Sequence, residues 1–480
     1  MRNGQKVTNA DGRRSRHAID MLHGSLWDKI ILFALPFMAS SVLQQLFNAT
    51  DTAVVGRFAS SQAMAAVGSN ASVIALIIGL FTGMAMGTNV VVARRIGQGR
   101  DQDIHDAAVT SMALAILGGF FLIIVGAVVS RPLLILMGTP DDVLEQAVLY
   151  LRLFMLGMPF NMVYNFGSAV LRSKGDSRRP LYALMVSGIF NVALNLLFVI
   201  VFRWGVAGVA IATGLANVVS ATIILILLSR EEERFRVTLR GLYIRKTPLL
   251  DILRIGIPAG LQGMVFSFSN IILQSAINSF GSAAVAGSAA AQNFEFISYF
   301  IINSFTQAAV TFTSQNYGAG DLKRCREVFK WAILFGTGIS MCADVAFVLC
   351  RYQLIGFFAT DPEVIHYAVT RMTTVLLFGW IANSYEVVGG ALRGLGYSML
   401  PTILAIIGSC LFRIAWVFTL FRQTGTFESL IIVYPVTRAL TGTMMVTAYL
   451  IVRRRLARQN VTGSGPAGKG NGSDGRQTEQ

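Results

Sequence analysis

A single carboxylate stands out near the start of this chain, because it lies inside an apolar segment. Asp51 follows Gln44 and Asn48 in the run LPFMASSVLQQLFNATDTAVVGR. The spacing i, i+4, i+7 places these three side chains on one face of a helix. An ionisable group within a membrane is costly unless it faces a partner or a water-filled cavity, so it indicates a functional site. Asp51 could bind and release a proton, or bind Na⁺ through carboxylate and amide oxygens. A permanently hydrogen-bonded packing residue is the alternative.

Polar residues on other apolar segments could surround this carboxylate. They recur at four-residue steps, so each set shares one helix face. An inward cluster of amides and hydroxyls around Asp51 is the simplest arrangement, because such groups hydrogen-bond the ionised form. The residues are Ser187, Asn191 and Asn195 in segment 181–202, Thr213 and Asn217 in segment 205–229, and Asn161 and Asn165 in segment 144–171.

Pro36 lies about four helical turns before Asp51. A proline inside a helix frees a backbone carbonyl and permits a kink. The spacing fits a moving hinge and a fixed bend equally well.

The second half of the chain has charged residues of its own. Glu295 has no basic partner nearby in the sequence, and Gln292 shares its helix face, so both are candidates for contact with a cationic substrate. Glu386 is a third candidate, although it could simply pair with Arg413. Asp344 is expected close enough to a helix end to reach water.

The composition predicts an all-α membrane protein, with 54% apolar and only 14% charged residues among 480. Apolar runs long enough to cross a bilayer, about 20 residues each, recur along the chain. We expect twelve spans, at 28–55, 63–93, 107–129, 144–171, 181–202, 205–229, 250–279, 284–314, 328–350, 364–392, 400–421 and 428–452.

The chain also repeats itself. AVLRSKGDSRRP (169–180) returns as GALRGLGYSMLP (390–401), and Gly97 and Gly318 keep the same offset of 221 residues. Because each copy has an even number of helices, we predict two six-helix bundles related by a pseudo-two-fold axis along the membrane normal. Asp51 corresponds to Leu273 or a near neighbour, so the buried carboxylate belongs to one copy only.

These features predict five parts. They are an N-terminal tail (1–26), an N-terminal bundle (27–229), a linker (230–249), a C-terminal bundle (250–452) and a disordered basic, Gly/Ser-rich tail (453–480). The net charge of +15 gathers in both tails and in alternate loops, which indicates that both termini are cytoplasmic rather than that the chain binds nucleic acid. Since the repeat supplies both halves, we expect a monomer surrounded by lipid.

Signals for other classes of protein are absent from the sequence. There is no GxxxxGK[ST] loop for ATP, and the motifs HExxH, GxSxG and CxxC are missing. The four cysteines have no metal or redox spacing. We therefore expect a transporter without a cofactor or a resident metal site, and not an enzyme.

Several runs together resemble the multidrug and toxic compound extrusion (MATE) family, across about residues 25–452. Besides the run around Asp51 and the two repeated turns, they are RRIGQG (94–99), NVALNLLFV (191–199), GVAGVAIAT (205–213) and the extended second turn SYEVVGGALRGLGYSMLP (384–401). The resemblance implies two six-helix bundles around a V-shaped cavity, and antiport of organic compounds against H⁺ or Na⁺ across the inner membrane of a prokaryotic cell.

The resemblance also implies roles for individual residues. Asp51 would take part in ion coupling, with Asn191, Asn195 and Thr213 as polar partners, and a bend near Pro36 would accompany its protonation. The chain departs from some relatives, which carry an acid where it has Asn195 and another in the seventh helix.

Two other classes of function can be weighed against export. A flippase for lipid-linked precursors would share the two-bundle architecture, but we expect it to line its cavity with several cationic residues, and only Arg413 and Arg438 are expected inside helices. A receptor or membrane enzyme would not need two halves, and the sequence contains no catalytic constellation.

Overall fold

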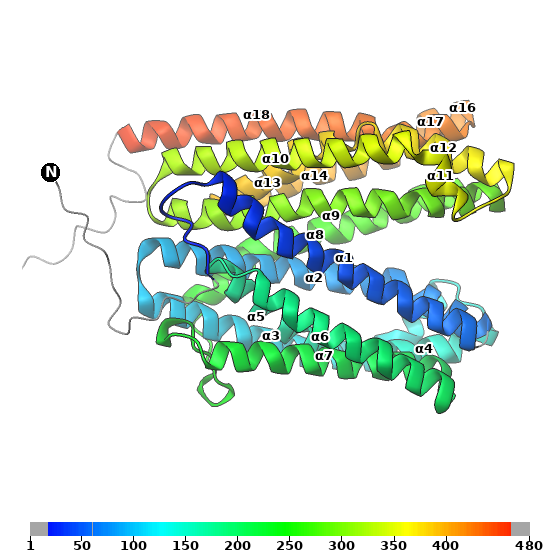
Figure 1. Ribbon diagram of the computed structural model, residues 1–480, viewed down its shortest axis with the longest axis horizontal. Helices are drawn as coiled ribbons and strands as arrows, with labels where there is room; N and C mark the ends of the chain where they lie inside the picture. Colours follow the sequence, from blue (N-terminus) through cyan, green and yellow to red (C-terminus); the bar gives the residue numbers. More distant parts are fainter. Residues whose placement is uncertain (1–17, 60, 462–480) are drawn as a thin grey trace, which may run out of the picture.

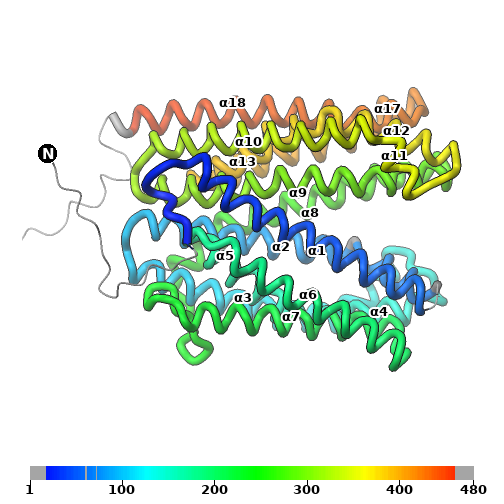
Figure 2. Tube along the Cα trace, in the orientation of Figure 1, coloured from blue at the N-terminus to red at the C-terminus, as the bar shows by residue number. Residues whose placement is uncertain are grey.

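The computed structural model describes residues 18–59 and 61–461, and its regular elements within this part are all helices. They form two bundles that lie side by side with their long axes parallel (Figure 1). The first bundle is built mainly from the first half of the chain and the second mainly from the second half (Figure 2). The predicted all-α fold with two bundles is confirmed.

The helices of the first half are α1 (Trp27–Phe58), α2 (Ser61–Gln98), α3 (Asp101–Leu136), α4 (Asp141–Leu156), α5 (Met158–Ser173), α6 (Arg178–Leu196), the π-helix η1 (Leu197–Val201) and α7 (Gly205–Ser229). Two 3₁₀ turns, η2 (Glu233–Phe235) and η3 (Leu239–Gly241), lie between the halves. The second half contains α8 (Lys246–Asn278), α9 (Ser282–Gly318), α10 (Leu322–Leu349), α11 (Arg351–Gly356), α12 (Pro362–Leu376), η4 (Gly379–Ala382), α13 (Asn383–Gly394), α14 (Met399–Ala405), η5 (Ile406–Leu411), α15 (Phe412–Trp416), η6 (Val417–Phe421), α16 (Arg422–Thr424), α17 (Phe427–Ile431) and α18 (Val433–Val461).

The spans agree with the predicted number. Over the described residues, nine helical stretches and two bent pairs, α4 with α5 and α12 with α13, are long and apolar enough to cross a membrane. The 37-residue helix α9 lies alongside them and completes the twelve (Figure 1). The bends are 45° and 44°, so each bundle carries one broken span.

Some boundaries differ from those predicted. Helix α8 begins at Lys246, inside the predicted linker, and α18 continues to Val461. The prediction of a disordered tail was therefore wrong for residues 453–461, and the remainder of that tail and residues 1–17 lie outside the described residues.

Helix α1 divides its contacts between the bundles. Before Pro36, Ile30 and Phe33 pack into an apolar cluster with residues of the second half such as Phe312. Phe33 and Phe312 meet edge to face, with ring centroids 5.7 Å apart. The later part of α1 packs against α6 of the first bundle. Pro36 thus lies where the helix passes from one bundle to the other.

Small residues join the bundles along α2 and α8. A Cβ atom placed on Gly83 would lie 2.2 Å from the backbone nitrogen of Gly260, and one on Gly87 would lie 2.5 Å from the carbonyl oxygen of Ile252. Only glycine allows such an approach of two backbones, which is the usual basis of close helix packing in membranes.

The repeated glycines identified in the sequence meet at one end of the molecule. A Cβ on Gly97 would lie 1.9 Å from the carbonyl oxygen of Gln315, and a Cβ on Gly318 would lie 2.1 Å from that of Arg94. These two contacts are equivalent under the repeat offset. The bundles are in direct contact here, and we call this the closed end.

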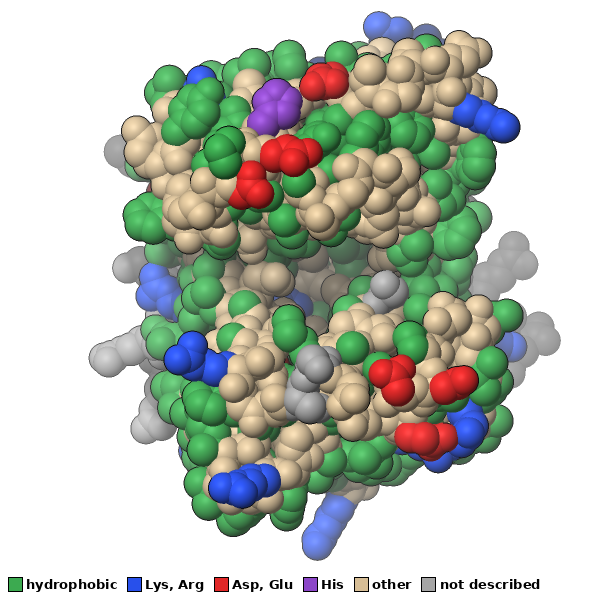
Figure 3. All heavy atoms as spheres, turned by 90° about the vertical axis from the view of Figure 1, so that its right-hand side faces the viewer, with side chains coloured by type: hydrophobic (Ala, Val, Ile, Leu, Met, Phe, Trp, Pro, Cys, Tyr) green, Lys and Arg blue, Asp and Glu red, His purple; other side chains and the backbone are tan. Residues whose placement is uncertain are grey.

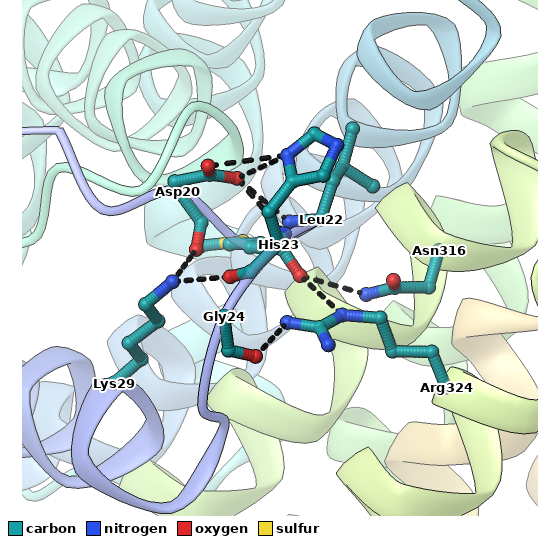
Figure 4. A network of polar contacts seen from close by, with 8 residues as sticks. Asp20, Leu22, His23, Gly24, Lys29, Asn316 and Arg324 are labelled. Atoms are coloured by element: carbon teal, nitrogen blue, oxygen red, sulfur yellow. Dashed lines mark hydrogen bonds and ion pairs between the residues drawn. The ribbon is translucent and has the colours of Figure 1, made fainter. Parts of the chain in front are cut away.

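Residues 18–26 cross the closed end and contact both bundles. The amide of Ile19 donates to the carbonyl of Gly175 in the first bundle (3.2 Å). In the second bundle, Asn316 and Arg324 each donate to the carbonyl of Met21 (3.2 Å for both), and Arg324 also donates to that of Gly24 (2.9 Å) (Figure 4). The backbone of this segment therefore ties the two bundles together.

A buried ion network fixes the repeated turn of the first bundle at the same end. Glu231, just after α7, accepts from Lys174 and from Arg179, which also contacts Asp176. Burial by itself would raise the pKa of Glu231, but the two cations together hold this pKa below its ordinary value. The carboxylate thus stays ionised and anchors the turn to the end of α7.

The glycine contact between α2 and α8 predicts a matched pair of effects. Gly83→Ala places a methyl group against backbone that cannot move aside, so we expect it to destabilise the protein by about 1–3 kcal/mol or more. Gly68→Ala, on the same helix with nothing within 4 Å of the added atom, should leave stability unchanged or raise it by up to about 1 kcal/mol. Thermal unfolding in detergent measures both. Equal melting temperatures for the two variants would contradict the contact.

Candidate functional site

The polar residues predicted around Asp51 meet inside the first bundle. The amide of Asn195 on α6 donates to Oδ1 of Asp51, and the hydroxyl of Thr213 on α7 donates to Oδ2 (3.2 Å). Asn191 donates to the Thr213 oxygen (3.3 Å) and accepts from Asn195 (3.2 Å). Both carboxylate oxygens are therefore held by neutral donors, and the four side chains form one connected network.

The surroundings of this network are apolar. Asp51 is 9% exposed, Asn195 is fully buried, and Val54 and Val55 are buried one turn further along α1. Within the described residues, no lysine, arginine or histidine forms an ion pair with Asp51. Its charge therefore has no fixed counter-ion in the protein, which leaves the carboxylate free to bind a mobile cation.

Local structure explains how the network is positioned. Residues 191 and 195 are one turn apart on α6, so both amides point to the same side. The backbone then widens into the π-helix η1 directly after α6, and three residues separate the end of η1 from the start of α7. The short connection makes α6 and α7 antiparallel neighbours, and the later part of α1 packs against this pair. Single π-helical turns inside α-helices are frequent at functional sites.

The remaining candidates in the first half lie apart from the network. Gln44 and Asn48 are exposed side chains on α1 and make no hydrogen bond to Asp51. Asn165 donates to the side chain and the backbone carbonyl of Asn161 (2.9 Å each). The common face of α1 predicted from the spacing thus does not become a single polar cluster.

Glu295 has a basic partner, contrary to prediction. Arg371 on α12 donates to both of its carboxylate oxygens, at 2.7 and 3.0 Å. Arg371 is 1% exposed and its guanidinium also lies over the ring of Tyr434. The sequence argument overlooked an arginine inside span 364–392, although a basic residue in an apolar span needs a partner and could have been searched for. Gln292, one turn away from Glu295, is only partly buried.

The suggested pair of Glu386 and Arg413 is not formed in the described structure. Arg413 donates to Thr437 and to Asn270 (3.3 Å each), and lies over Phe266. Glu386 is partly buried on α13 without an ion-pair partner in the described part of the chain. Its proposed role toward substrate therefore remains a prediction.

Asp344 does not reach water, contrary to expectation. It lies five residues before the end of α10, near a helix end as expected, but it is fully buried. The sequence analysis expected only Arg413 and Arg438 inside helices, and this number was too low. Arg371 and Arg393 are also buried there, together with Arg413.

The end of the molecule opposite residues 18–26 is hollowed between the bundles (Figure 3). Acidic and basic side chains stand on the end faces of both bundles, whereas the visible walls of the hollow between them are mostly apolar or uncharged (Figure 3). We call this the open end. The molecule is therefore closed at one end and open at the other.

Comparison with known proteins agrees with the repeat and the fold. The MatE family model matches residues 36–197 and again residues 258–419, so both copies are recognised and well over half of the chain is covered. The chain belongs to the MatE family. It is a polytopic membrane transporter and not an enzyme, and members of this family need no cofactor.

Individual relatives cover most of the chain. It is similar to the "Probable multidrug resistance protein YoeA" of Bacillus subtilis, with 26% identity over 80% of this chain and 84% of the relative. It is also similar to the "Probable multidrug resistance protein NorM" of Thermotoga maritima, with 28% identity over 83% and 86%. A solved structure described as the outward-facing conformation of a multidrug resistance MATE family transporter has a TM-score of 0.86 and 22% identity, over 93% of this chain and all of that one. This last likeness shows the fold.

The ion pair between α9 and α12 predicts a large loss of stability when one partner is removed, and a recovery when both partners are replaced. Arg371→Met leaves the largely buried Glu295 without its partner, which costs up to about 3–5 kcal/mol. The double variant Glu295→Leu with Arg371→Met replaces the pair by apolar groups and should recover most of this loss. Thermal unfolding of the purified protein in detergent compares the two. A double variant less stable than Arg371→Met would show that the pair is not the relevant interaction.

Proposed function

We propose that this MatE transporter exports amphipathic, often cationic organic molecules in exchange for H⁺ or Na⁺, with Asp51 as the ion-binding group. The observation that carries the proposal is the buried Asp51 carboxylate, held by Asn195 and Thr213 and without a basic partner in the described structure. The names of the relatives, which are multidrug resistance proteins, support the substrate class. The weakly charged walls of the open end suit apolar organic molecules (Figure 3).

Coupling follows from the position of α1. Its first part is anchored in the second bundle and its later part carries Asp51 in the first bundle. Binding of a cation to Asp51 changes the charge that Asn195 and Thr213 hold, and therefore changes how firmly α1 is held against α6 and α7. Movement near Pro36 would then alter the cavity and displace substrate. Two ligands can be coupled only through their different affinities for the conformations of the protein.

The orientation and assembly state belong to the same proposal. The basic loops and tails favour cytoplasmic termini by the positive-inside rule, and the bacterial relatives support the inner membrane of a prokaryotic cell. The closed end, which carries residues 18–26, would then face the cytoplasm and the open end the outside. Since the two bundles supply both halves of the pathway, a monomer is sufficient.

Flipping of a lipid-linked precursor remains the second candidate. More arginines are buried inside helices than the sequence analysis expected, and a flippase would need cationic residues in its cavity. These arginines are nevertheless engaged by the protein. Arg371 binds Glu295, Arg413 binds Thr437 and Asn270, and Arg393 donates to Gln262 (2.7 Å). All three are at most 5% exposed, so they offer little to a pyrophosphate group, and export stays the better fit.

The role of Asp51 is tested by transport in liposomes. Asp51→Asn keeps the shape and the hydrogen-bonding capacity of the side chain, but it cannot bind a proton or supply a charged ligand to Na⁺. We expect uphill movement of a fluorescent organic cation to fall to background under an imposed pH or Na⁺ gradient. Asp142→Asn, which changes an exposed carboxylate on α4, should transport as the wild-type protein does.

Normal uphill transport by Asp51→Asn would overturn the proposal. Its elution volume and melting temperature in detergent show whether the variant has folded. The two gradients, applied separately to the wild-type protein, identify the coupling ion.

Removal of either donor to Asp51 should shift the ion concentration at half-maximal transport, in opposite directions for H⁺ and for Na⁺. Asn195→Leu and Thr213→Val each remove a hydrogen bond to a charged group, which contributes about 1.5–3 kcal/mol. This loss disfavours the carboxylate relative to the carboxylic acid, so half-maximal transport should move about tenfold or more toward lower H⁺ concentration. With Na⁺ as the coupling ion, the loss of an oxygen ligand should instead raise the Na⁺ concentration required.

The control for this pair lies on the same helix. Thr222→Val removes a hydroxyl from an exposed position on α7, where it bonds only to the Val218 carbonyl (2.7 Å). Its ion dependence should match that of the wild-type protein. An unchanged ion dependence in Asn195→Leu and Thr213→Val would show that the donors do not hold the coupling group.

A further inference from the structure

A second carboxyl group is enclosed in the other bundle, in a different way from Asp51. Asp344 on α10 is fully buried, and neither of its oxygens has a hydrogen-bond partner among the described residues. The position 221 residues earlier is Ile123, so the first copy has no equivalent acid. Asp344 is therefore a feature of the second bundle, as Asp51 is of the first.

The charged groups near Asp344 are already engaged elsewhere. Glu295 and Ser298 on α9 and Arg438 on α18 face it, and Arg371 on α12 stands behind Glu295 as its partner. Arg371 directs two nitrogens at Glu295, and Arg438 donates to the carbonyl of Val375 (2.5 Å). An ionised Asp344 would thus be a buried charge beside a second carboxylate and without a bonded cation, which is strongly unfavourable.

Asp344 lies against the break between α12 and α13. Gly336, Ser340 and Asp344 are four residues apart and share one face of α10. Ser340 accepts from Asn383, the first residue of α13 (2.9 Å). A Cβ on Gly379 would lie 2.3 Å from Oδ2 of Asp344. The carboxyl group therefore fits directly against the broken segment, and only glycine leaves room for it.

The same face carries another unsatisfied buried group. The Oδ1 atom of Asn383 has no hydrogen-bond donor in the described structure and points at Gly336, where an added Cβ would lie 2.7 Å away. Acceptors without donors are rare in protein interiors and call for an explanation. A change in the angle between α12 and α13 would alter what Asn383 and Asp344 meet.

We propose that Asp344 is a second proton-carrying group of this transporter, which holds a proton in the conformation described here and releases it when the break between α12 and α13 opens to water. The proposal rests on the proposed function and extends it, because each substrate would then exchange for two protons, one carried in each bundle. The two acids differ in their surroundings, since Asn195 and Thr213 donate to the oxygens of Asp51 whereas Asp344 lies against the backbone at Gly379, with Ser298 and Arg438 as the donor side chains that face it.

The first test reads the proton directly. Infrared spectra of the full-length protein with ¹³C-labelled aspartate, at pH 7 in detergent, show whether any aspartate is a neutral carboxylic acid. We expect such a carbonyl band in the wild-type protein, and in Asp344→Asn we expect the loss of the intensity that one aspartic acid contributes, whether or not Asp51 is protonated. Glu428→Gln, an exposed acid of the same bundle, should leave the band unchanged.

The Asp51→Asn variant keeps this test decisive if Asp344→Asn does not fold. The band should persist in Asp51→Asn, because Asp344 still carries its proton there. Absence of the band from that variant, or an undiminished band in a folded Asp344→Asn, would overturn the assignment.

The second test counts protons per substrate. In liposomes, a pH gradient is imposed, and the gradient of a fluorescent organic cation is measured at the point where its net movement stops. The two gradients are then compared. We expect the number of protons exchanged per substrate to be halved in Asp344→Asn, and to be unchanged in Glu428→Gln. If the wild-type protein couples to the pH gradient and Asp344→Asn keeps the wild-type ratio, only the assignment of Asp344 fails. If the wild-type protein moves no substrate under a pH gradient, the proton-coupled form of the proposed function itself fails.

Discussion

A carboxylate in the apolar interior of a helical bundle must either have its charge satisfied or lose it. In this protein the Asp51 carboxylate is satisfied by uncharged donors, Asn195 and Thr213, and not by an arginine or lysine. A fixed cation would make the charge permanent, whereas neutral donors stabilise it only in part. Much of the first bundle can be understood from this requirement, since α6, η1 and α7 must lie together on the side of α1 that carries the acid.

Helix α1 gives this local chemistry a possible effect on the whole molecule. Ile30 and Phe33 bury themselves in the second bundle, and Pro36 precedes the part of the helix that belongs to the first. The closed end resists separation because glycine contacts and the backbone of residues 18–26 hold the bundles together. A transporter that alternates between two openings must break these contacts, so any energy supplied at Asp51 has to reach them through α1 or through the contact of α2 with α8.

Periodicity predicted much of the fold and part of the site. Four-residue spacing put Asn191 and Asn195 on one face of α6, and the packing of α6 and α7 against α1 brings this face and Thr213 to Asp51. The same argument failed for Gln44 and Asn48, which precede Asp51 on α1 but stay exposed. Long-range pairing was not predictable in this way. Arg371 meets Glu295 only because α12 packs on α9, and the burial of Asp344 depends on the break before α13, which no local pattern marks. The basic residues after 452 indicated the membrane boundary but said nothing about how far α18 continues.

The central claim is that Asp51 exchanges its cation when substrate binds, and proton release measures this without any membrane. A fluorescent organic cation is added to the purified protein in weakly buffered detergent solution while the pH is recorded, and Na⁺ binding is followed in parallel by competition with a radioactive sodium tracer. The account predicts that substrate releases one of these ions from the wild-type protein and that Asp51→Asn, although folded, releases less. Equal release of the ion from both proteins would contradict it.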